Sequence, residues 1–245
     1  VIIKHANPCG VSINKSALHS FKNAFSSDPI SAFGGVISCN FKIDKKIATE
    51  INKNFLEVIL AKGFENEALQ ILKRKKNLRI IDISKYKQKN QITAKLYDGS
   101  FLLQDKDASI FNRKNLKFVT KRKPSKNEIN ELLFAFNICK YVKSNAIVLT
   151  NKFSTIGVGA GQSSRLDSCR IAVQKAKKFQ PKKINGSIAA SDAFFPFVDG
   201  IKTLISAGVK IIIQPGGSVR DKEVIDEANK SNIKMVFTGV RHFNH

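Results

Sequence analysis

Lys4 and His5 are the first neighbours along the chain whose side chains could act together in a reaction. They stand between the apolar run at 1–3 and the turn-forming sequence Asn-Pro-Cys-Gly at 7–10. Imidazole is the side chain whose unperturbed pKa lies nearest neutrality, so a histidine beside a lysine is suited to moving protons. The pair is therefore a candidate for general acid-base catalysis. The competing interpretation is a solvated lysine beside a histidine of the core.

Two glycine-rich segments are typical of ligand-binding turns. Gly-Val-Gly-Ala-Gly-Gln at 157–162 resembles half of a dinucleotide fingerprint, but Gln162 occupies the third glycine position, so we reject a Rossmann site. The remaining interpretation is a strand end against which a ligand or another segment packs closely. Gln-Pro-Gly-Gly-Ser at 214–218 lies between an apolar run and a helical pattern, where exposed backbone N–H groups favour anionic ligands.

Aromatic and charged residues gather in two further places. The segment 190–200 combines three phenylalanines with two carboxylates and is suited to holding a flat ring system. The alternative is a hydrophobic loop inserted into the core, with Asp192 as a helix cap. Arg241, His242 and His245 follow a strand-like run, although terminal segments of this kind are ordinarily frayed and solvated.

Strand-like and helical patterns alternate around these residues, which indicates an α/β layered fold. Ser125 and Glu128 have capping-box spacing and predict the start of a helix. The lysine-rich stretch at 114–126 is the best candidate for an internal boundary, so we divide the chain into halves at 1–122 and 123–245. Helical periods predict one helix from about 165 and another that contains 223–225. Apolar runs predict strands at 146–149, 156–158, 209–213 and 235–237.

The composition restricts the partners and the compartment. Lys and Arg number 42 against 19 Asp and Glu, a formal net charge of +23 over 245 residues. Such a charge attracts anionic ligands or polyanions, although the joint over-use of Lys, Asn and Ile fits compositional drift at least as well. The four cysteines form no Cys-x-x-Cys pair and indicate buried, reduced thiols, with neither a zinc site nor a disulfide framework. No apolar run approaches the roughly 20 residues of a membrane span and no secretory signal is present, so we expect a cytoplasmic protein without membrane contact.

Seven motifs occur in order along the whole chain: Lys-His-Ala-Asn-Pro-Cys-Gly at 4–10, Asp-Pro-Ile-Ser-Ala-Phe-Gly-Gly at 28–35, Lys-Ser-Asn-Ala-Ile at 143–147, Gly-Val-Gly-Ala-Gly-Gln-Ser-Ser-Arg at 157–165, Ser-Asp-Ala-Phe-Phe-Pro-Phe at 191–197, Gln-Pro-Gly-Gly-Ser at 214–218 and Phe-Thr-Gly-Val-Arg-His-Phe at 237–243. In this combination the sequence resembles the transformylase region of the AICAR transformylase/IMP cyclohydrolase family. The resemblance implies a duplicated cytidine-deaminase-like layered α/β/α fold without that fold's zinc. It also implies AICAR formyltransferase activity, in which 10-formyltetrahydrofolate gives its formyl group to AICAR and FAICAR is formed during de novo IMP biosynthesis.

The resemblance implies roles for individual residues and an assembly. The residues that match the family's catalytic groups are Lys4, His5 and Asn145. Those that match its AICAR-binding groups are His5, Gly34, Glu57, Asn145, Phe194 and Arg241. Those that match its folate-binding groups are Arg165, Asp199, Gly217 and Ser218, while His245 matches a terminal histidine near the site. No residue is implied in metal binding, and the implied assembly is a homodimer with shared active sites.

The sequence also departs from the family's pattern. A cyclohydrolase domain and an Arg-Tyr pair that helps to bind the nucleotide precede the Lys-His motif in the family, whereas this sequence begins at Val1. We therefore expect a fragment of a bifunctional enzyme; the alternatives are a truncated protein with weakened nucleotide binding and a catalytically inactive relative. The rival from another class is a basic RNA-binding module, but the sequence carries no RNA-binding signature and we expect no nucleic-acid partner.

Overall fold

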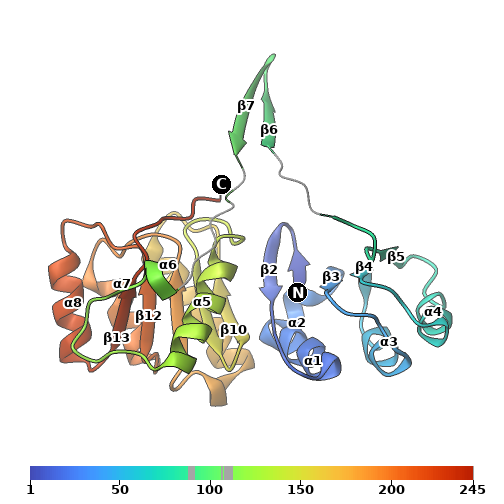
Figure 1. Cartoon of the computed structure of the whole chain (residues 1–245), viewed down its shortest axis with the longest axis horizontal. Coiled ribbons are helices and arrows are strands. Elements are labelled where there is room, and N and C mark those ends of the chain that lie inside the picture. The colour runs from blue at the N-terminus through green and yellow to red at the C-terminus, as the bar shows by residue number, and fades with distance from the viewer. Residues whose placement is uncertain (88–91, 106, 108–112, 245) are drawn as a thin grey trace.

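The computed structural model describes residues 1–87, 92–105, 107 and 113–244 (Figure 1). Two mixed sheets with their own helices lie side by side, and a two-stranded hairpin projects from between them. The strand order is β2-β1-β3-β4-β5 in the first sheet and β10-β9-β11-β12-β13-β8 in the second. The predicted α/β layered fold is thus confirmed, while the cytidine-deaminase-like assignment stays a prediction.

The first sheet packs against its helices in a single core. Its elements are β1 (Ile2–Lys4), β2 (Asn7–Gly10), α1 (Ala17–Ser27), α2 (Pro29–Ala32), β3 (Gly35–Cys39), α3 (Lys45–Asn52), β4 (Leu56–Ala61), α4 (Asn66–Leu72) and β5 (Arg79–Asp82). Strand β1 is antiparallel to β2 and β3, whereas β3, β4 and β5 are parallel. Ile37 and Ile59 point into the core with the helices. Val36 and Leu60 alternate with them and are only half buried, and Ile81 beside Leu60 is 43% exposed.

The second sheet is covered on both faces. Its elements are η1 (Arg113–Asn115), β8 (Lys117–Phe118), α5 (Lys126–Cys139), β9 (Ile147–Asn151), β10 (Ser154–Gly159), α6 (Arg165–Phe179), η2 (Pro181–Lys183), β11 (Ile188–Ser191), α7 (Val198–Ser206), β12 (Ile211–Gln214), α8 (Asp221–Lys230) and β13 (Lys234–Phe237). Ile147 and Leu149 pack with α6, α7 and α8, whereas Val148 packs with α5 on the opposite face. This half is therefore a three-layer sandwich, and its central strands are largely apolar because both of their faces are buried.

Local sequence signals predicted the starts of two helices in this half, α5 and α6. Ser125 caps α5 and forms the complete capping box with Glu128, as predicted. Helix α6 begins at Arg165 after the cap residue Ser164, and β9 and β10 pair antiparallel through a short turn. Strand β8 already belongs to the second sheet before residue 123, so the proposed division at 122/123 falls inside the second layer system and stays a prediction.

The two halves are joined by buried polar contacts. Val11 N donates to Thr155 Oγ1 at 2.9 Å, and Lys175 Nζ lies 2.8 Å from Asp28 Oδ2. Burial opposes ionisation of Asp28, but hydrogen bonds from Lys175 and Ser31 outweigh it and hold the pKa of this carboxyl below its usual value. These two contacts therefore favour one position of the first half relative to the second.

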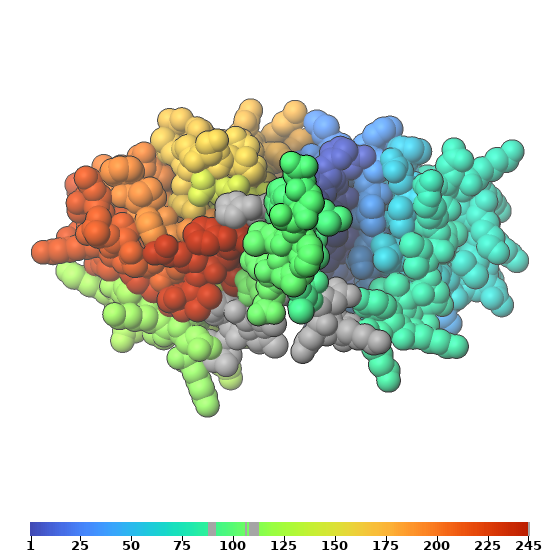
Figure 2. All heavy atoms as spheres, turned by 90° about the horizontal axis from the view of Figure 1, so that it is seen from above, coloured from blue at the N-terminus to red at the C-terminus, as the bar shows by residue number. Residues whose placement is uncertain are grey.

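The hairpin of β6 (Ile92–Tyr97) and β7 (Ser100–Asp105) forms a separate two-stranded sheet. Seen from above, it stands over the region where the first and second halves meet (Figure 2). Leu96 faces Phe101 across the strands, and their side chains are 85% and 65% exposed. An isolated hairpin of this size is marginally stable in water, so this exposed apolar surface requires an explanation.

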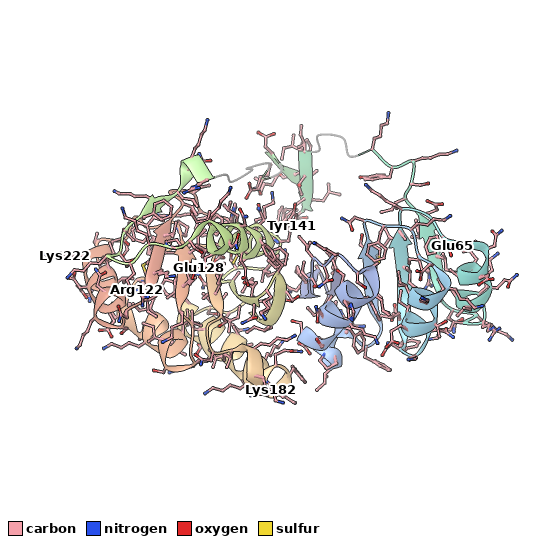
Figure 3. The ribbon with its side chains drawn as sticks, turned by 60° about the horizontal axis from the view of Figure 1, so that its bottom comes forward. Glu65, Arg122, Glu128, Tyr141, Lys182 and Lys222 are labelled. Carbon is pink, nitrogen blue, oxygen red and sulfur yellow. The ribbon has the colours of Figure 1, made fainter. Side chains whose placement is uncertain are left out.

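Charged side chains surround the outside of both halves, and Glu65, Arg122, Lys182 and Lys222 are exposed examples (Figure 3). All four cysteines are buried free thiols, as predicted. Within the described ranges, no three His, Cys, Asp or Glu side chains come together as metal ligands would. None of the described helices combines the length and apolarity needed to cross a bilayer.

Candidate active site

The Lys4–His5 motif lies at the tip of the β1–β2 hairpin. Lys4 pairs with Asn7, and the two residues between them, His5 and Ala6, have φ values of +47° and +64°. Both are thus in the left-handed region that a two-residue turn of this twist requires, and that region is unfavourable for residues other than glycine. The turn leaves His5 exposed, so its ring is available to a ligand; the alternative of a core histidine is wrong.

Lys4, Gly34 and Glu57 lie together at one end of the inner strands β1, β3 and β4. Lys4 Nζ donates to Gly34 O at 2.7 Å. Gly34 has φ +64°, and a Cβ at this position would lie 2.9 Å from Lys4 Nζ and 3.4 Å from Glu57 Oε1. A side chain at position 34 would therefore displace the lysine, which explains why glycine is needed here.

A cavity of about 280 Å³ lies between this hairpin and the second half, and Lys4, His5 and Gln162 line it. Asn7 Oδ1 accepts from Lys143 N at 2.9 Å, which ties the hairpin to the segment that leads into Asn145. Cys9 also lines the cavity, but burial raises the pKa of its thiol to about 11. The thiol is therefore protonated near neutrality and is not a nucleophile here.

Asn145 lies two residues before β9, and its side chain makes three hydrogen bonds. Its Oδ1 accepts from Arg165 Nη2 at 2.6 Å, and its Nδ2 donates to Gln162 O at 2.9 Å and Ser163 O at 3.1 Å. Gln162 therefore links Asn145 to the cavity that holds Lys4. Gln162 thus connects the predicted catalytic residues, although Lys4 and His5 line one cavity and Asn145 lines another.

Arg165 opens α6 beneath that second cavity and is 8% exposed. Its Nη1 donates to Ser191 Oγ at 2.7 Å and to Asp192 Oδ1 at 2.6 Å. Asp192 is fully buried and forms an ion pair with the guanidinium, so the interpretation of Asp192 as a helix cap is wrong. Its contact with Arg165 was missed from the sequence, although the motif Ser-Asp-Ala-Phe-Phe-Pro-Phe contains it.

The second cavity has a volume of about 540 Å³ and brings together five predicted residues: Asn145, Arg165, Phe194, Asp199 and Arg241. The Arg241 guanidinium carbon lies 4.7 Å from the centre of the Phe194 ring. Asp199 is exposed in the first turn of α7, where a carboxylate is favoured by the helix dipole.

Neither interpretation of the 190–200 segment is complete by itself. Phe195 is inserted into the core, and a Cβ at Gly200 would lie 2.9 Å from its ring. Phe194 and Phe197 line the cavity, and Phe197 is 51% exposed. One aromatic residue therefore fixes the loop, while its neighbours leave ring faces open to a ligand.

Gly217 and Ser218 form the turn between β12 and α8. Gly217 has φ +91°, its N donates to Asp221 Oδ2 at 2.7 Å, and a Cβ there would lie 3.6 Å from Arg241 Nη2. The turn thus lies beside Arg241, although neither of its residues lines the 540 Å³ cavity. Ser218 Oγ accepts from Arg220 N at 3.1 Å.

The C-terminal segment contacts the core through His242 and Asn244. His242 is 1% exposed, so the frayed-tail interpretation is wrong for it. Its Nδ1 lies 2.5 Å from Asp107 Oδ2. Burial lowers the pKa of His242 below its usual value, although Asp107 acts in the opposite direction. His245 lies outside the described residues, and its placement near the site stays a prediction.

Comparison with known proteins finds relatives that match the whole chain and a family model that matches most of it. A family model described as "AICARFT/IMPCHase bienzyme" matches residues 1–175. The chain is 45% identical over 245 residues to "Bifunctional purine biosynthesis protein PurH" of Leptospira biflexa serovar Patoc, covering all of this chain and 48% of that protein. It is 45% identical over 244 residues to the protein of the same name from Aquifex aeolicus strain VF5, covering 100% of this chain and 47% of the relative.

The chain thus spans about half the length of these curated relatives. A solved structure, reduced HcgD from Methanocaldococcus jannaschii, aligns over 96% of this chain and 79% of its own with a TM-score of 0.19 and 9% identity, which is too low to bear on the fold. The sequence matches are decisive by themselves: this chain belongs to the AICARFT/IMPCHase bienzyme family.

Proposed function

We propose that this chain carries the AICAR formyltransferase activity of the bienzyme. In the reaction, the 5-amino nitrogen of AICAR bonds to the formyl carbon of 10-formyltetrahydrofolate, the bond from that carbon to N10 breaks, and a proton passes from the amine to N10. The observation that supports this best is the 540 Å³ cavity, where five residues matching the family's site motifs converge. We place IMP cyclohydrolase activity in the part of the longer relatives that this chain does not cover.

Lys4 and His5 have the chemistry for the proton transfers. The amine of AICAR is a poor nucleophile, so loss of its proton must accompany attack, and N10 must gain a proton as it leaves. His5 is exposed at the hairpin tip, and Lys4 is held by Gly34 O beside it. We assign the proton transfers to this pair and orientation of the nucleotide to Asn145.

The nucleotide-binding groups lie in both halves. We assign Gly34 and Glu57 in the first half, and Phe194 and Arg241 in the second, to AICAR. Phe194 offers a ring face next to an arginine, a combination suited to a flat heterocycle carrying a phosphate.

The folate groups are Arg165, Asp199 and the Gly217–Ser218 turn. The exposed aromatic faces and the exposed Asp199 carboxylate fit a flat pterin ring with N–H donors. Arg165 is already occupied by Asp192 and Asn145, so we expect its contribution to the folate to be indirect. The net charge of +23 would attract the carboxylates of the folate and the phosphate of AICAR.

We further propose that the active protein is a homodimer with shared sites. Lys4 and His5 line one cavity of the chain, whereas Asn145, Phe194 and Arg241 line another. The first sheet leaves one apolar face half buried, and the β6–β7 hairpin exposes Leu96, Phe101 and Leu103. A second copy of the chain would cover both surfaces, and an obligate interface of this kind buries more than about 2,000 Å².

The test is a formyl-transfer assay on the full-length gene product that contains this chain. AICAR and 10-formyltetrahydrofolate are the substrates, and the rate is measured from the formation of tetrahydrofolate. We expect turnover that requires both substrates. No turnover, together with tight RNA binding at about 150 mM salt, where exposed charges are strongly screened, would favour the RNA-binding alternative.

A further inference from the structure

Asp192 is a buried carboxylate at the centre of a polar network. It is 0% exposed, its Oδ1 lies 2.6 Å from Arg165 Nη1, and its Oδ2 accepts from Ser144 Oγ at 2.5 Å. Its backbone O accepts from His242 N at 2.9 Å. A buried ion pair adds little net stability compared with apolar residues of the same volume, because both charges lose their hydration. The pair therefore calls for a role other than stabilising the fold.

The partners of Asn145 determine which way its side-chain amide points. A guanidinium has donors and no acceptor, so the atom of Asn145 that meets Arg165 Nη2 at 2.6 Å must be the amide oxygen. The amide nitrogen then donates both hydrogens to the carbonyls of Gln162 and Ser163, which can only accept. No donor of the amide is left for a ligand, and the oxygen keeps one lone pair.

We infer that the Arg165–Asp192 pair is a positioning device that locks the Asn145 amide as a hydrogen-bond acceptor at the wall of the 540 Å³ cavity. In this state Asn145 takes a hydrogen bond from an N–H of the nucleotide, either its amine or its carboxamide. Asp192 is the positioning residue, because it binds both Arg165 and Ser144. Ser144 directly precedes Asn145 in the chain.

The inference rests on the proposed function for the identity of the ligand, but the locked amide can be measured without any reaction. In the full-length gene product, both side-chain amide protons of Asn145 should be protected from hydrogen exchange, as observed by nuclear magnetic resonance. Asp192→Asn should accelerate that exchange by about tenfold or more, since the guanidinium loses its anchor. Equal exchange in parent and variant would overturn the inference, whether or not the protein transfers formyl groups.

The kinetic test separates positioning from stability. Asp192→Asn should lower kcat by about 10²-fold, the effect typical of a misplaced reacting group. Thermal unfolding should show that the variant is still folded. If an uncompensated Arg165 charge prevents folding, the double variant Arg165→Met/Asp192→Leu removes both charges and should fold with the same loss of turnover. A folded double variant with parental kcat would contradict the inference.

Glu128→Gln is the matched control, because it removes the partly buried ion pair with Lys234, whose Nζ lies 2.7 Å from Glu128 Oε1. It should leave both amide exchange at Asn145 and kcat at parental values. A comparable loss in this control would show that any broken ion pair has the effect, and would overturn a specific role for Asp192. Absence of formyl transfer in the parent would instead refute the proposed function and leave the exchange measurement to decide.

Discussion

The second sheet is covered by helices on both faces, whereas the first sheet is covered on one. Val148 and Leu149 are both fully buried although they point to opposite faces of β9. In the first sheet, Ile59 is fully buried and Leu60 beside it is only half buried. The three-layer half therefore provides a rigid support for Asn145 and Arg165, and the two-layer half carries Lys4 beside an apolar face that still needs a partner.

This difference indicates which half of the chain should form the interface of an oligomer. Apolar surface that a single chain leaves exposed favours the interface of an oligomer, because burial of apolar surface drives association. Both open surfaces, the sheet face and the β6–β7 hairpin, belong to residues before 106. Variants in the two halves should therefore differ in kind: the first half should control proton transfer and assembly, and the second half ligand affinity and local order.

The largest effect is expected at the hairpin tip of the first half. Lys4→Ala or His5→Ala should lower kcat by about 10²- to 10⁴-fold, since a general acid or base is lost. The exposed residues Lys15 and His19 in the same half serve as controls, and Lys15→Ala and His19→Ala should keep parental turnover. Near-parental kcat in both Lys4 and His5 variants would remove the basis of the mechanism.

The next effect concerns assembly. Leu96→Asp combined with Phe101→Asp places two charges on the apolar face of the hairpin and should convert dimers to monomers in sedimentation, because charges are excluded from interface cores. Thr93→Asp alters the other face of the same hairpin and should leave the dimer intact. A double variant that sediments like the parent would exclude the hairpin from the interface.

Asp199 in the second half should affect affinity and not chemistry. Asp199→Ala should raise the KM for 10-formyltetrahydrofolate by about tenfold at unchanged kcat, the effect of losing one hydrogen bond to a charged group. Asp226 is an exposed carboxylate on α8, and Asp226→Ala should leave the KM unchanged. An equal fall in kcat would place Asp199 among the reacting groups.

The smallest effect is expected in the pH dependence of stability. His242 has a lowered pKa because it is buried, so the folded state binds fewer protons than the unfolded state below about pH 6.5. Its contribution is therefore present above that pH and is lost as the pH falls. Between pH 7 and about pH 5, the Tm of His242→Asn should fall less than the Tm of the parent, whereas the Tm of His19→Gln should fall as the parent's does. Identical curves for parent and His242→Asn would contradict this.

Much of the second half could be predicted from its sequence because the signals are local. The Ser125–Glu128 capping box and the apolar runs of β9 and β10 depend on neighbouring residues. The β6–β7 hairpin also had a local signal, since Asp98-Gly99 between alternating apolar residues is typical of a two-residue turn.

What the sequence could not provide depends on distant residues meeting. Arg165 and Asp192 are 27 positions apart, and their ion pair exists only because the fold brings the start of α6 to the residue that follows β11. His242 shows the same limit: its burial follows from packing on Phe136, whose ring centre lies 4.6 Å from that of the imidazole. Likewise, coverage of a sheet on one face or two follows from helix placement, which apolar periodicity within a strand does not specify.

The central claim is a formyl-transfer site that combines the Lys4 hairpin of one subunit with the Arg241 cavity of another. The direct measurement mixes two impaired variants of the full-length gene product, Lys4→Ala and Arg241→Ala, under conditions of subunit exchange. Formyl transfer is assayed at an AICAR concentration too low to saturate the Arg241→Ala sites. Half of the dimers formed at random are mixed and contain one intact site each, so the account predicts recovery of about a quarter of parental activity. A mixture no more active than its components, beside an active parent, would contradict the shared site.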